Sequence, residues 1–366
     1  MKDKERTMIS SAIVLAAIDS ARFYPSGDNC QCFRFHFSEP QQRLSIIYKA
    51  ELAKHTLVYD DFVLTLTLGG LLEYLRIAFL HHGFAINYQT HPEDFSPYQD
   101  HAVATLTFSK GAATANEIKL ATLKNRVTDR RAFLPPANLR KDLATCLFDS
   151  PLDVSAHTEA VDDTLQFFSI CDSLVWQSRP LGMDIFNSVN FTQAPLTGLP
   201  PTNLGISKLQ VLPIKLIQKQ AAFYDIFKLC GAQNTQTKTQ LTLWQSSRAF
   251  LCASHPKNAS WAQKIIFSQQ LMSLTLRLSE LGYAFQPSTL STEILNLPIK
   301  PLRNLQTTAA LKLHQVEDKL SHVRTCLGLN ATQQVLWIIR CGKVQSPLPQ
   351  KARTHRLAAS TLLQTT

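Results

Sequence analysis

Hydrophobic residues recur along this chain with two different spacings, which together predict a mixed α+β protein. Ile9, Ile13, Ala16 and Ala17 share one helical face, so a helix is predicted over about 9–22. Residues 33–37 alternate phenylalanines with polar side chains, which is the spacing of a half-buried strand. Further strands are predicted at 44–48, 102–108, 248–253 and 335–341, and further helices at 117–125 and 138–148.

Two long helices are predicted at 62–82 and 259–281. The first is apolar almost all round, which is typical of a helix buried on most sides. Gly69 and Gly70 in its middle weaken a helix, so close approach of another backbone is predicted there. A shift of 199 residues superimposes the leucines of the two helices. Both end in a glycine–aromatic pair that leads into a predicted strand, and this repetition indicates an internal duplication.

The predicted boundary between the two halves lies near residue 116. We therefore expect a first half over 1–115 and a second half over 116–366. Residues 187–245 are rich in Gln, Thr, Pro and Lys, and they are predicted to be an irregular insertion. Such a segment could act as a lid or as a dimer arm.

Composition identifies a globular protein with a sizeable core, because 45% of the 366 residues are apolar and 17% are charged. The net charge of +10 suits nucleic acid, an anionic membrane or a phosphorylated ligand. The basic residues are scattered without a nucleic-acid-reading motif, so no nucleic-acid partner is expected. No apolar run of about 20 residues is recognised, and no membrane partner is predicted.

The N-terminal residues and the cysteines bear on the compartment. Basic residues before Met8–Ile18 faintly resemble a signal peptide, but Ser10, Ser11 and Asp19 favour an amphipathic helix instead. The eight cysteines lack the paired spacing of a zinc site, so no metal site is predicted. Free thiols, mostly buried, in a reducing cytoplasm are the expectation.

Two stretches carry the candidate chemistry. Residues 24–35 contain a Pro-Ser-x-x-Asn-x-Gln turn, and residues 126–133 pack three arginines and a threonine around one aspartate. Arginine binds phosphate bidentately, while Ser and Asn offer neutral hydrogen bonds. An anion attached to a planar ring would satisfy both stretches. Each stretch alone could instead be an ordinary turn or a solvated basic segment.

Several enzyme classes are disfavoured by missing motifs. The chain has no Gly-x-Gly-x-x-Gly, P-loop, His-Glu-x-x-His or Gly-x-Ser-x-Gly sequence. A Rossmann enzyme, a nucleoside triphosphatase, a zinc hydrolase and an α/β-hydrolase are therefore not expected.

The pair of stretches resembles the two signature motifs of the FMN-dependent nitroreductases, in the internally duplicated, Acg-like branch. The resemblance covers most of the chain and implies an α+β fold in which one polypeptide imitates the family's dimer. It implies FMN binding by Pro25, Ser26, Asn29 and Gln31 of the turn, by Arg126, Thr128 and Arg130, by Gly198 in a loop over the ring, and by Lys351 and Arg353 near the far end. The chain departs from the family pattern at Cys32-Phe33, where Pro-Trp is usual, and at 264–269, where Gly-Gln-Ala is usual.

The resemblance implies an oxidoreductase in which NAD(P)H reduces the flavin, and a nitroaromatic, quinone or similar small molecule then accepts the electrons. No catalytic side chain is predicted, because the cofactor carries the chemistry. Two alternatives stay open: a protein that stores FMN with little turnover, because 187–245 could cover the ring, and a degenerate flavin-free binding protein. Because each motif occurs once, we expect one FMN per chain and a monomer that mimics a dimer, with further association open.

Overall fold

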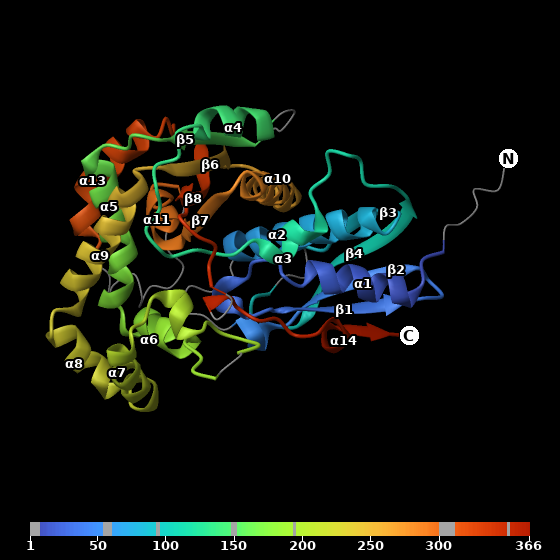
Figure 1. Cartoon of the computed structure of the whole chain (residues 1–366), viewed down its shortest axis with the longest axis horizontal. Helices are drawn as coiled ribbons and strands as arrows, with labels where there is room; N and C mark the ends of the chain where they lie inside the picture. Colours follow the sequence, from blue (N-terminus) through green and yellow to red (C-terminus); the bar gives the residue numbers. More distant parts are fainter. Residues whose placement is uncertain are drawn as a thin grey trace.

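The computed structural model describes residues 8–53, 61–92, 96–147, 152–192, 195–299, 312–349 and 352–366. Two β-sheets flank a pair of long central helices, and the remaining helices pack around this framework (Figure 1). The predicted α+β class is confirmed. Lys351 and Asp60, both singled out in the sequence, lie outside the described residues.

The first sheet has the strand order β3-β4-β2-β1-β9. Its strands are β1 Phe33–Ser38, β2 Arg43–Tyr48, β3 Phe84–Thr90, β4 His101–Lys110 and β9 Leu363–Thr365. Neighbours are antiparallel except β1 and β9, which pair in parallel. Phe33, Phe35 and Phe37 are all buried, as their alternation predicts.

The second sheet has the order β5-β6-β8-β7, and all its pairs are antiparallel. Its strands are β5 Asp153–His157, β6 Phe250–Pro256, β7 Tyr283–Ser288 and β8 Gln333–Lys343. In each half a strand, a long helix and a second strand follow one another along the chain. The order β3-β4-β2-β1 of the first sheet therefore has the same pattern as β7-β8-β6-β5 of the second.

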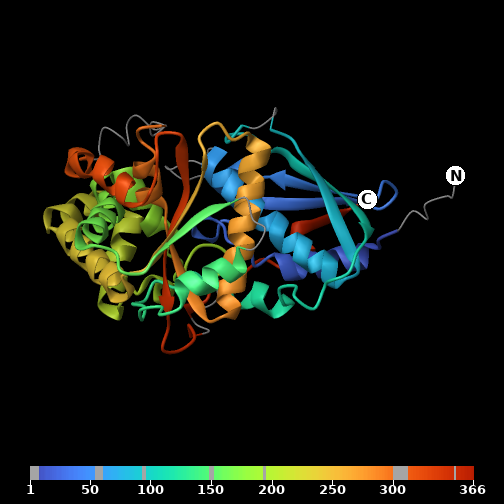
Figure 2. The same cartoon turned by 90° about the horizontal axis from the view of Figure 1, so that it is seen from above.

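The central helices α2 (Asp61–His81) and α10 (Trp261–Glu280) cross closely at a glycine (Figure 2). A Cβ atom on Gly69 would lie 2.5 Å from the Ser268 Cβ and 2.7 Å from the Ile265 carbonyl oxygen. The glycine therefore allows the two backbones to approach, as the sequence predicts. Apolar side chains of both helices are buried in shared cores, which join the two sheets into one body.

The sequence expectation that the chain has no apolar run of about 20 residues needs correction at α2. Among the described residues, Phe62–His81 is one helix that is long and apolar enough to cross a membrane. Most of its surface is buried inside the protein, against α10 and the first sheet, which is also how the core helix of a folded domain behaves.

Several further helices surround this framework. They are α1 Ser11–Ala21, α3 Leu120–Asn125, α4 Leu139–Cys146, α5 Asp162–Leu174, α6 Arg179–Ser188, α7 Lys208–Lys219, α8 Ala222–Leu229, α9 Ala232–Ser247, α11 Thr289–Leu295, α13 His314–Cys326 and α14 Ala359–Leu362. The prediction that 187–245 is irregular was wrong, because most of it forms α7, α8 and α9. Ser207 and Gln210 form a capping box at the start of α7, and Gly231 adopts the left-handed conformation that begins α9.

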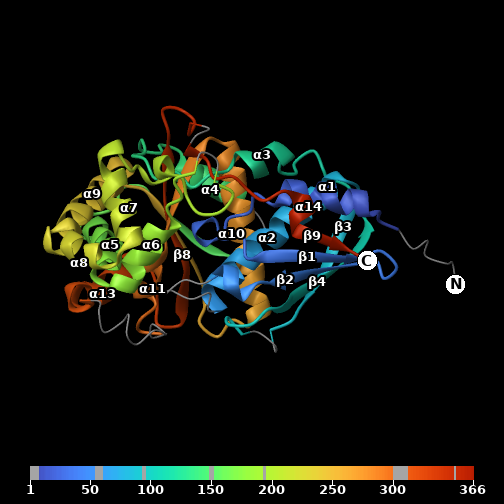
Figure 3. The same cartoon turned by 90° about the horizontal axis from the view of Figure 1, so that it is seen from below.

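The C-terminal tail returns from the second sheet to the first (Figure 3). The Thr366 N–H donates to the Phe37 carbonyl oxygen at 3.0 Å, beside the β1–β9 pairing. Residues 352–357 are thereby held along the turn at 25–31. The predicted division at residue 116 stays a prediction, although β9 joins the first sheet.

All eight cysteines are free thiols. Cys32, Cys171, Cys252 and Cys341 are buried, as expected, but Cys230 and Cys326 are exposed. Burial raises the pKa of the Cys171 thiol well above its usual value, so this buried thiol is kept neutral.

Candidate functional site

The turn between α1 and β1 has an unusual backbone. Asp28, Asn29 and Gln31 have φ values of +45°, +60° and +49°, in the left-handed region that non-glycine residues seldom occupy. The Ser26 hydroxyl accepts a hydrogen bond from the Gln31 N–H at 3.1 Å and helps to close the turn. Such conformations persist only where the surroundings impose them, and they cluster at functional sites.

Side-chain hydrogen bonds from this turn reach two distant segments. The Asn29 amide donates to the carbonyl oxygens of Gly198, at 3.1 Å, and of His355, at 3.0 Å. The Gln31 amide donates to the Leu196 carbonyl oxygen at 2.5 Å and accepts from the Leu357 N–H at 2.9 Å. Both side chains are almost completely buried. The segment 196–198 and the tail therefore lie directly on the turn.

The arginine-rich stretch follows α3 and runs beside β7. Thr128 forms a β-bridge with Phe285, and the Asp129 N–H donates to the Phe285 carbonyl oxygen at 3.0 Å. The buried Asp129 carboxylate pairs with Arg131 at 2.7 Å. These contacts fix the backbone from which Arg126 and Arg130 project.

The two projecting arginines have different surroundings. The Arg126 Nε donates to the Tyr74 hydroxyl on α2 at 3.0 Å. Arg130 bonds to the Asn203 side chain, whose amide donates to the Ala352 carbonyl oxygen at 2.9 Å. Burial lowers the pKa of Arg130, and the nearby Asp28 opposes that shift. Arg130 is therefore tied into the loop before α7.

A cavity of about 300 Å³ lies where α1, the arginine stretch and the tail meet. Five of its lining side chains are basic, and none is acidic; the basic ones are Arg22, Lys124, Arg126, Arg353 and Arg356. We call this the cationic cavity. Arg126 and Arg353 also line a second cavity of about 570 Å³ between α3 and residues 344–348. The convergence of positive charge fits an anion such as phosphate.

Arg356 is the most constrained of the five. Its guanidinium bonds to the Asn29 side-chain oxygen, and to the Thr354 hydroxyl at 2.7 Å, and its Nε has no hydrogen-bond partner among the described residues. Burial, together with repulsion from Arg126, lowers the pKa of Arg356 to about 10. Among the described residues, Arg356 forms no ion pair with a carboxylate. A half-buried cation without an acidic partner suits an anionic ligand.

A narrow apolar slot continues from Arg126 towards the second sheet. Pro25, Met272, Phe285 and Trp337 line it, and its volume is about 30 Å³. The Trp337 indole N–H is covered and has no hydrogen-bond partner in the described parts of the chain. An unbonded donor in an apolar slot fits a flat ligand with an acceptor at its edge. The slot is nevertheless close to the size of a single water.

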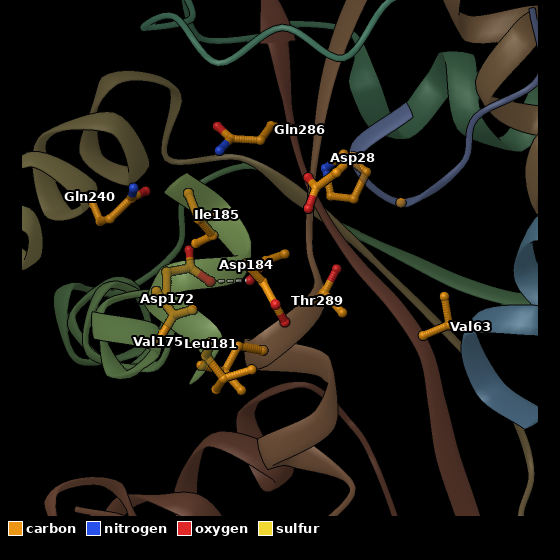
Figure 4. A pocket seen from close by; sticks show the side chains of 14 residues that line it. Asp28, Val63, Asp172, Val175, Leu181, Asp184, Ile185, Gln240, Gln286 and Thr289 are labelled. Carbon is orange, nitrogen blue, oxygen red and sulfur yellow. Dashed lines mark hydrogen bonds between the residues drawn. The ribbon is translucent and has the colours of Figure 1, made fainter. Parts of the chain in front are cut away.

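An acidic cavity of about 290 Å³ lies on the other side of the turn (Figure 4). Its side chains come from the turn, from α5 and α6, from α9 and from the junction of β7 with α11, and they include Asp28, Asp172, Asp184, Gln240 and Gln286. Burial raises the pKa of Asp172, while hydrogen bonds from Ser288, Trp244 and Ser291 oppose the rise. Pro287 lines both this cavity and the apolar slot.

Comparison with solved structures finds distant likenesses. A nitroreductase-like family protein from Bacillus cereus is 12% identical, covers 66% of this chain and 94% of its own, and has a TM-score of 0.30. The Y88A mutant of the FMN and NADPH-dependent nitroreductase NfnB from sphigopyxis sp. strain HMH is 14% identical over 67% and 96%, with a TM-score of 0.34. NfnB from Mycobacterium smegmatis, an FMN-dependent nitroreductase in complex with NADPH, is 16% identical over 67% and 96%, with a TM-score of 0.35.

No protein-family model and no curated protein sequence matches this chain. TM-scores below 0.5 at identities of 12–16% assign neither a cofactor nor a reaction to it. The case for a function therefore depends on the residues of the site.

The structure brings together most of the residues that the sequence singled out. Arg126 and Arg353 line the cationic cavity, and Pro25 and Arg126 line the apolar slot. Asn29 bonds to Gly198 beside them, whereas Thr128 and Arg130 line neither space. Lys351 lies outside the described residues.

Sequence reasoning missed Arg22, Lys124 and Arg356 in the cationic cavity, and Trp337 in the apolar slot. Arg356 follows Arg353 by three residues, so the density of basic residues in the tail was an available signal. Arg22 and Lys124 carry no such signal, because each is an ordinary basic residue near a helix end.

Proposed function

We propose that this chain is an FMN-dependent NAD(P)H oxidoreductase of the nitroreductase type. The observation that carries the proposal is Arg356, a half-buried guanidinium without a described carboxylate partner, beside four other lysine and arginine side chains in one cavity. A phosphate monoester is a dianion of the size that such a cavity accepts. When bound, FMN would supply the two-electron chemistry that links NAD(P)H to a nitroaromatic, quinone or similar acceptor.

The chain's own residues would divide the binding between them. Arg126, Arg353 and Arg356 would neutralise the phosphate, with Asn29 orienting Arg356. The Ser26 hydroxyl would offer an uncharged hydrogen bond nearby. Trp337 would donate its unbonded N–H to an edge atom of the ring. The acidic cavity adjoins the slot at Pro287 and is the proposed entry for the acceptor.

The phosphate end and the ring end fit FMN unequally. The cationic cavity supplies the donors and the charge for a phosphate, but the slot of about 30 Å³ is far smaller than ligand pockets of roughly 300 Å³ and more. The carbonyl oxygens of Gly198 and Leu196 accept hydrogen bonds from Asn29 and Gln31. We propose that segment 196–198 closes this end of the site, so that the ring of FMN would enter only after the segment moves.

This covering segment favours a second candidate function, the storage of FMN with little turnover. A protein that closes its own flavin site limits access of both NAD(P)H and the acceptor. The two candidates share the phosphate site and differ only in whether the bound flavin is reduced by a nicotinamide.

The visible absorption spectrum of the purified protein tests both candidates. An oxidised flavin band that bleaches on anaerobic addition of NADH or NADPH, and returns with a quinone or nitroaromatic, supports the oxidoreductase. Bleaching by dithionite alone supports storage. The absence of any flavin band, even after reconstitution with FMN, would contradict both.

We also propose that the two halves are copies of one ancestral unit. The repeated sheet order and the pair of central helices support this. The turn and the arginine stretch each occur once, so the proposal includes one FMN per chain, in a monomer that mimics the family's dimer.

A further inference from the structure

The two most exposed large apolar residues in the described parts of the chain lie on α7 and α8. Leu209 is 90% exposed and Leu229 is 87% exposed, and Leu212, Leu216 and Ile226 are also exposed. The two helices lie at the end of the molecule away from both termini (Figure 1). Single exposed leucines need no explanation, but a concentration of them on adjacent helices indicates an interaction surface.

The residues of α7 form three stripes. Ile214 and Ile217 face inward, where they join a small core with Phe186 and Tyr224. Leu209, Leu212 and Leu216 recur every three or four residues and so share one solvent-facing side of the helix. Lys208, Lys215 and Lys219 follow the same rule and form a stripe beside the leucines.

The charge of this region is strongly one-sided. Residues 195–247 contain five lysines and one acidic residue, Asp225. Asp225 forms an ion pair with Arg179 at 3.4 Å, so its negative charge already has a basic partner. Lys215 also contacts the Phe191 ring at 5.0 Å, and Lys228 donates to the Gln177 carbonyl oxygen at 3.0 Å, while both stay exposed. The leucine stripe is therefore bordered by positive charge.

We propose that α7 and α8 dock on an anionic lipid surface. Exposed leucines can enter the boundary between headgroups and acyl chains, while adjacent lysines face the headgroup phosphates. A second copy of this chain is a poorer partner, because lysine stripe would meet lysine stripe. A bilayer surface satisfies both stripes at once, since phosphates and acyl chains lie beside each other there.

The sequence analysis predicted no membrane partner because it recognised no membrane-spanning segment. Docking of α7 and α8 on a lipid surface does not require such a segment. The proposal is also independent of FMN, because none of the α7 and α8 residues named above lines the cationic cavity.

Vesicle flotation of the full chain tests the proposal. The wild type is expected to float with vesicles of phosphatidylcholine containing about one-third phosphatidylglycerol, and not with phosphatidylcholine alone. Combined Lys208→Gln, Lys215→Gln and Lys219→Gln substitutions are expected to weaken partitioning at least about tenfold. Combined Leu209→Ser, Leu212→Ser and Leu216→Ser substitutions should do the same.

Matched controls are exposed apolar residues elsewhere on the chain. Leu281→Ser and Val161→Ser change side chains that are 48% and 54% exposed, and they should leave partitioning unchanged. Thermal unfolding followed by circular dichroism checks that every variant is folded. Serine at an exposed leucine position leaves no cavity, so folded protein is expected.

Three results would overturn the proposal. One is equal binding to neutral and anionic vesicles, and another is no binding of the wild type to either. The third is a leucine variant that keeps its vesicle binding but loses a lipid-free dimer in sedimentation velocity, which would identify a second copy as the partner.

Discussion

The Asn29 side-chain amide lies 3.0 Å from the carbonyl oxygen of His355, although 326 positions separate the two residues along the chain. The same Asn29 side chain accepts a hydrogen bond from Arg356. One amide thus fixes both the path of the tail and the direction of a guanidinium. The turn of the first half and the tail that follows the second sheet form a single structural unit.

Replacing basic residues of the cationic cavity should weaken FMN binding. Arg126→Ala and Arg356→Ala each remove a charge-assisted contact worth about 1.5–3 kcal/mol, so the Kd for FMN should rise about tenfold or more. Titration of the apoprotein, followed by quenching of flavin fluorescence, measures the Kd.

Arg140→Ala is the matched control for these variants, because Arg140 is exposed on α4. Its Kd should equal that of the wild type. An unchanged FMN affinity in both Arg126→Ala and Arg356→Ala would remove the phosphate assignment.

Disturbing the covering segment should speed reduction of the flavin. Gly198 has φ +73°, and a Cβ there would lie 2.6 Å from the Ser188 carbonyl oxygen, so Gly198→Ala must shift the segment. Asn29 and Gln31 then lose acceptors that hold the cover in place. Stopped-flow bleaching of the flavin by NADPH should be several-fold faster than in the wild type.

Gly205→Ala controls for backbone strain, since Gly205 has φ +69° but nothing within 4 Å of its would-be Cβ. It carries a similar left-handed cost, of roughly 1–2 kcal/mol, without moving the cover. Equal reduction rates in the two variants would show that 196–198 does not limit access.

Reconstitution with excess cofactor should yield about one FMN per chain. The turn at 25–29 and the arginine stretch at 126–131 each occur once, so the mirrored position between the halves lacks phosphate donors. Binding a dianion without such donors carries a large desolvation cost. Flavin absorbance per chain gives the ratio, and a value near two would contradict the single site.

The crossing of α2 and α10 should be sensitive to one methyl group. Gly69→Ala places a Cβ 2.5 Å from the Ser268 Cβ, and overpacking of this kind typically costs about 1–3 kcal/mol. Gly70→Ala meets the flexible Met272 Cε at 3.2 Å and makes only ordinary contact with Pro25 at 3.7 Å, so it should cost less. Urea unfolding compares the free energies of unfolding, and equal values for the two variants would refute a tight crossing at Gly69.

Stability should fall in mild acid because His255 is buried and His157 is half-buried. Burial lowers the pKa of both His157 and His255 below the ordinary value of about 6.5. Below this value the unfolded chain binds protons that the folded chain does not, so the free energy of unfolding decreases as the pH drops. Above it both states are neutral, and these histidines add no pH dependence.

His157→Phe tests this origin, because Phe can keep the stacking of His157 on Phe250, where the ring centroids are 4.6 Å apart. The variant should lose less stability between pH 6.5 and pH 5.5 than the wild type. His322→Phe on the exposed face of α13 is the control and should retain the wild-type slope. Identical slopes for all three proteins would assign the acid sensitivity to other groups.

The parts of the fold that the sequence predicted are those with strong local periodicity. The phenylalanine alternation of β1 and the apolar length of α2 follow from burial, and Gly69 marked the helix crossing correctly. The helices α7 and α8 were missed although their apolar residues follow a helical period, because the Gln, Thr, Pro and Lys content of 187–245 favoured an irregular segment. In α9 the apolar period itself is weak. The short strands β5 and β9 were missed because pairing, more than propensity, defines them.

The site was predictable only where its residues are close in sequence. The spacing of the polar residues within 25–31 and of the arginines within 126–130 identified two of the segments that form the site. Arg22, Lys124 and Arg356 converge because the tail crosses back to the first sheet, and no local pattern encodes that path. Arg130 was expected at the phosphate but bonds to Asn203, which belongs to a segment that the sequence presented as irregular.

The crossing tail has a consequence for how the protein is made. Arg22 and Arg356 line one cavity, so a nascent chain on the ribosome cannot form that cavity until more than 330 further residues have been added after Arg22. The FMN site that we propose would therefore be completed only after translation has passed Arg356. A fragment that lacks residues 353–356 should accumulate without bound FMN however well its first sheet folds.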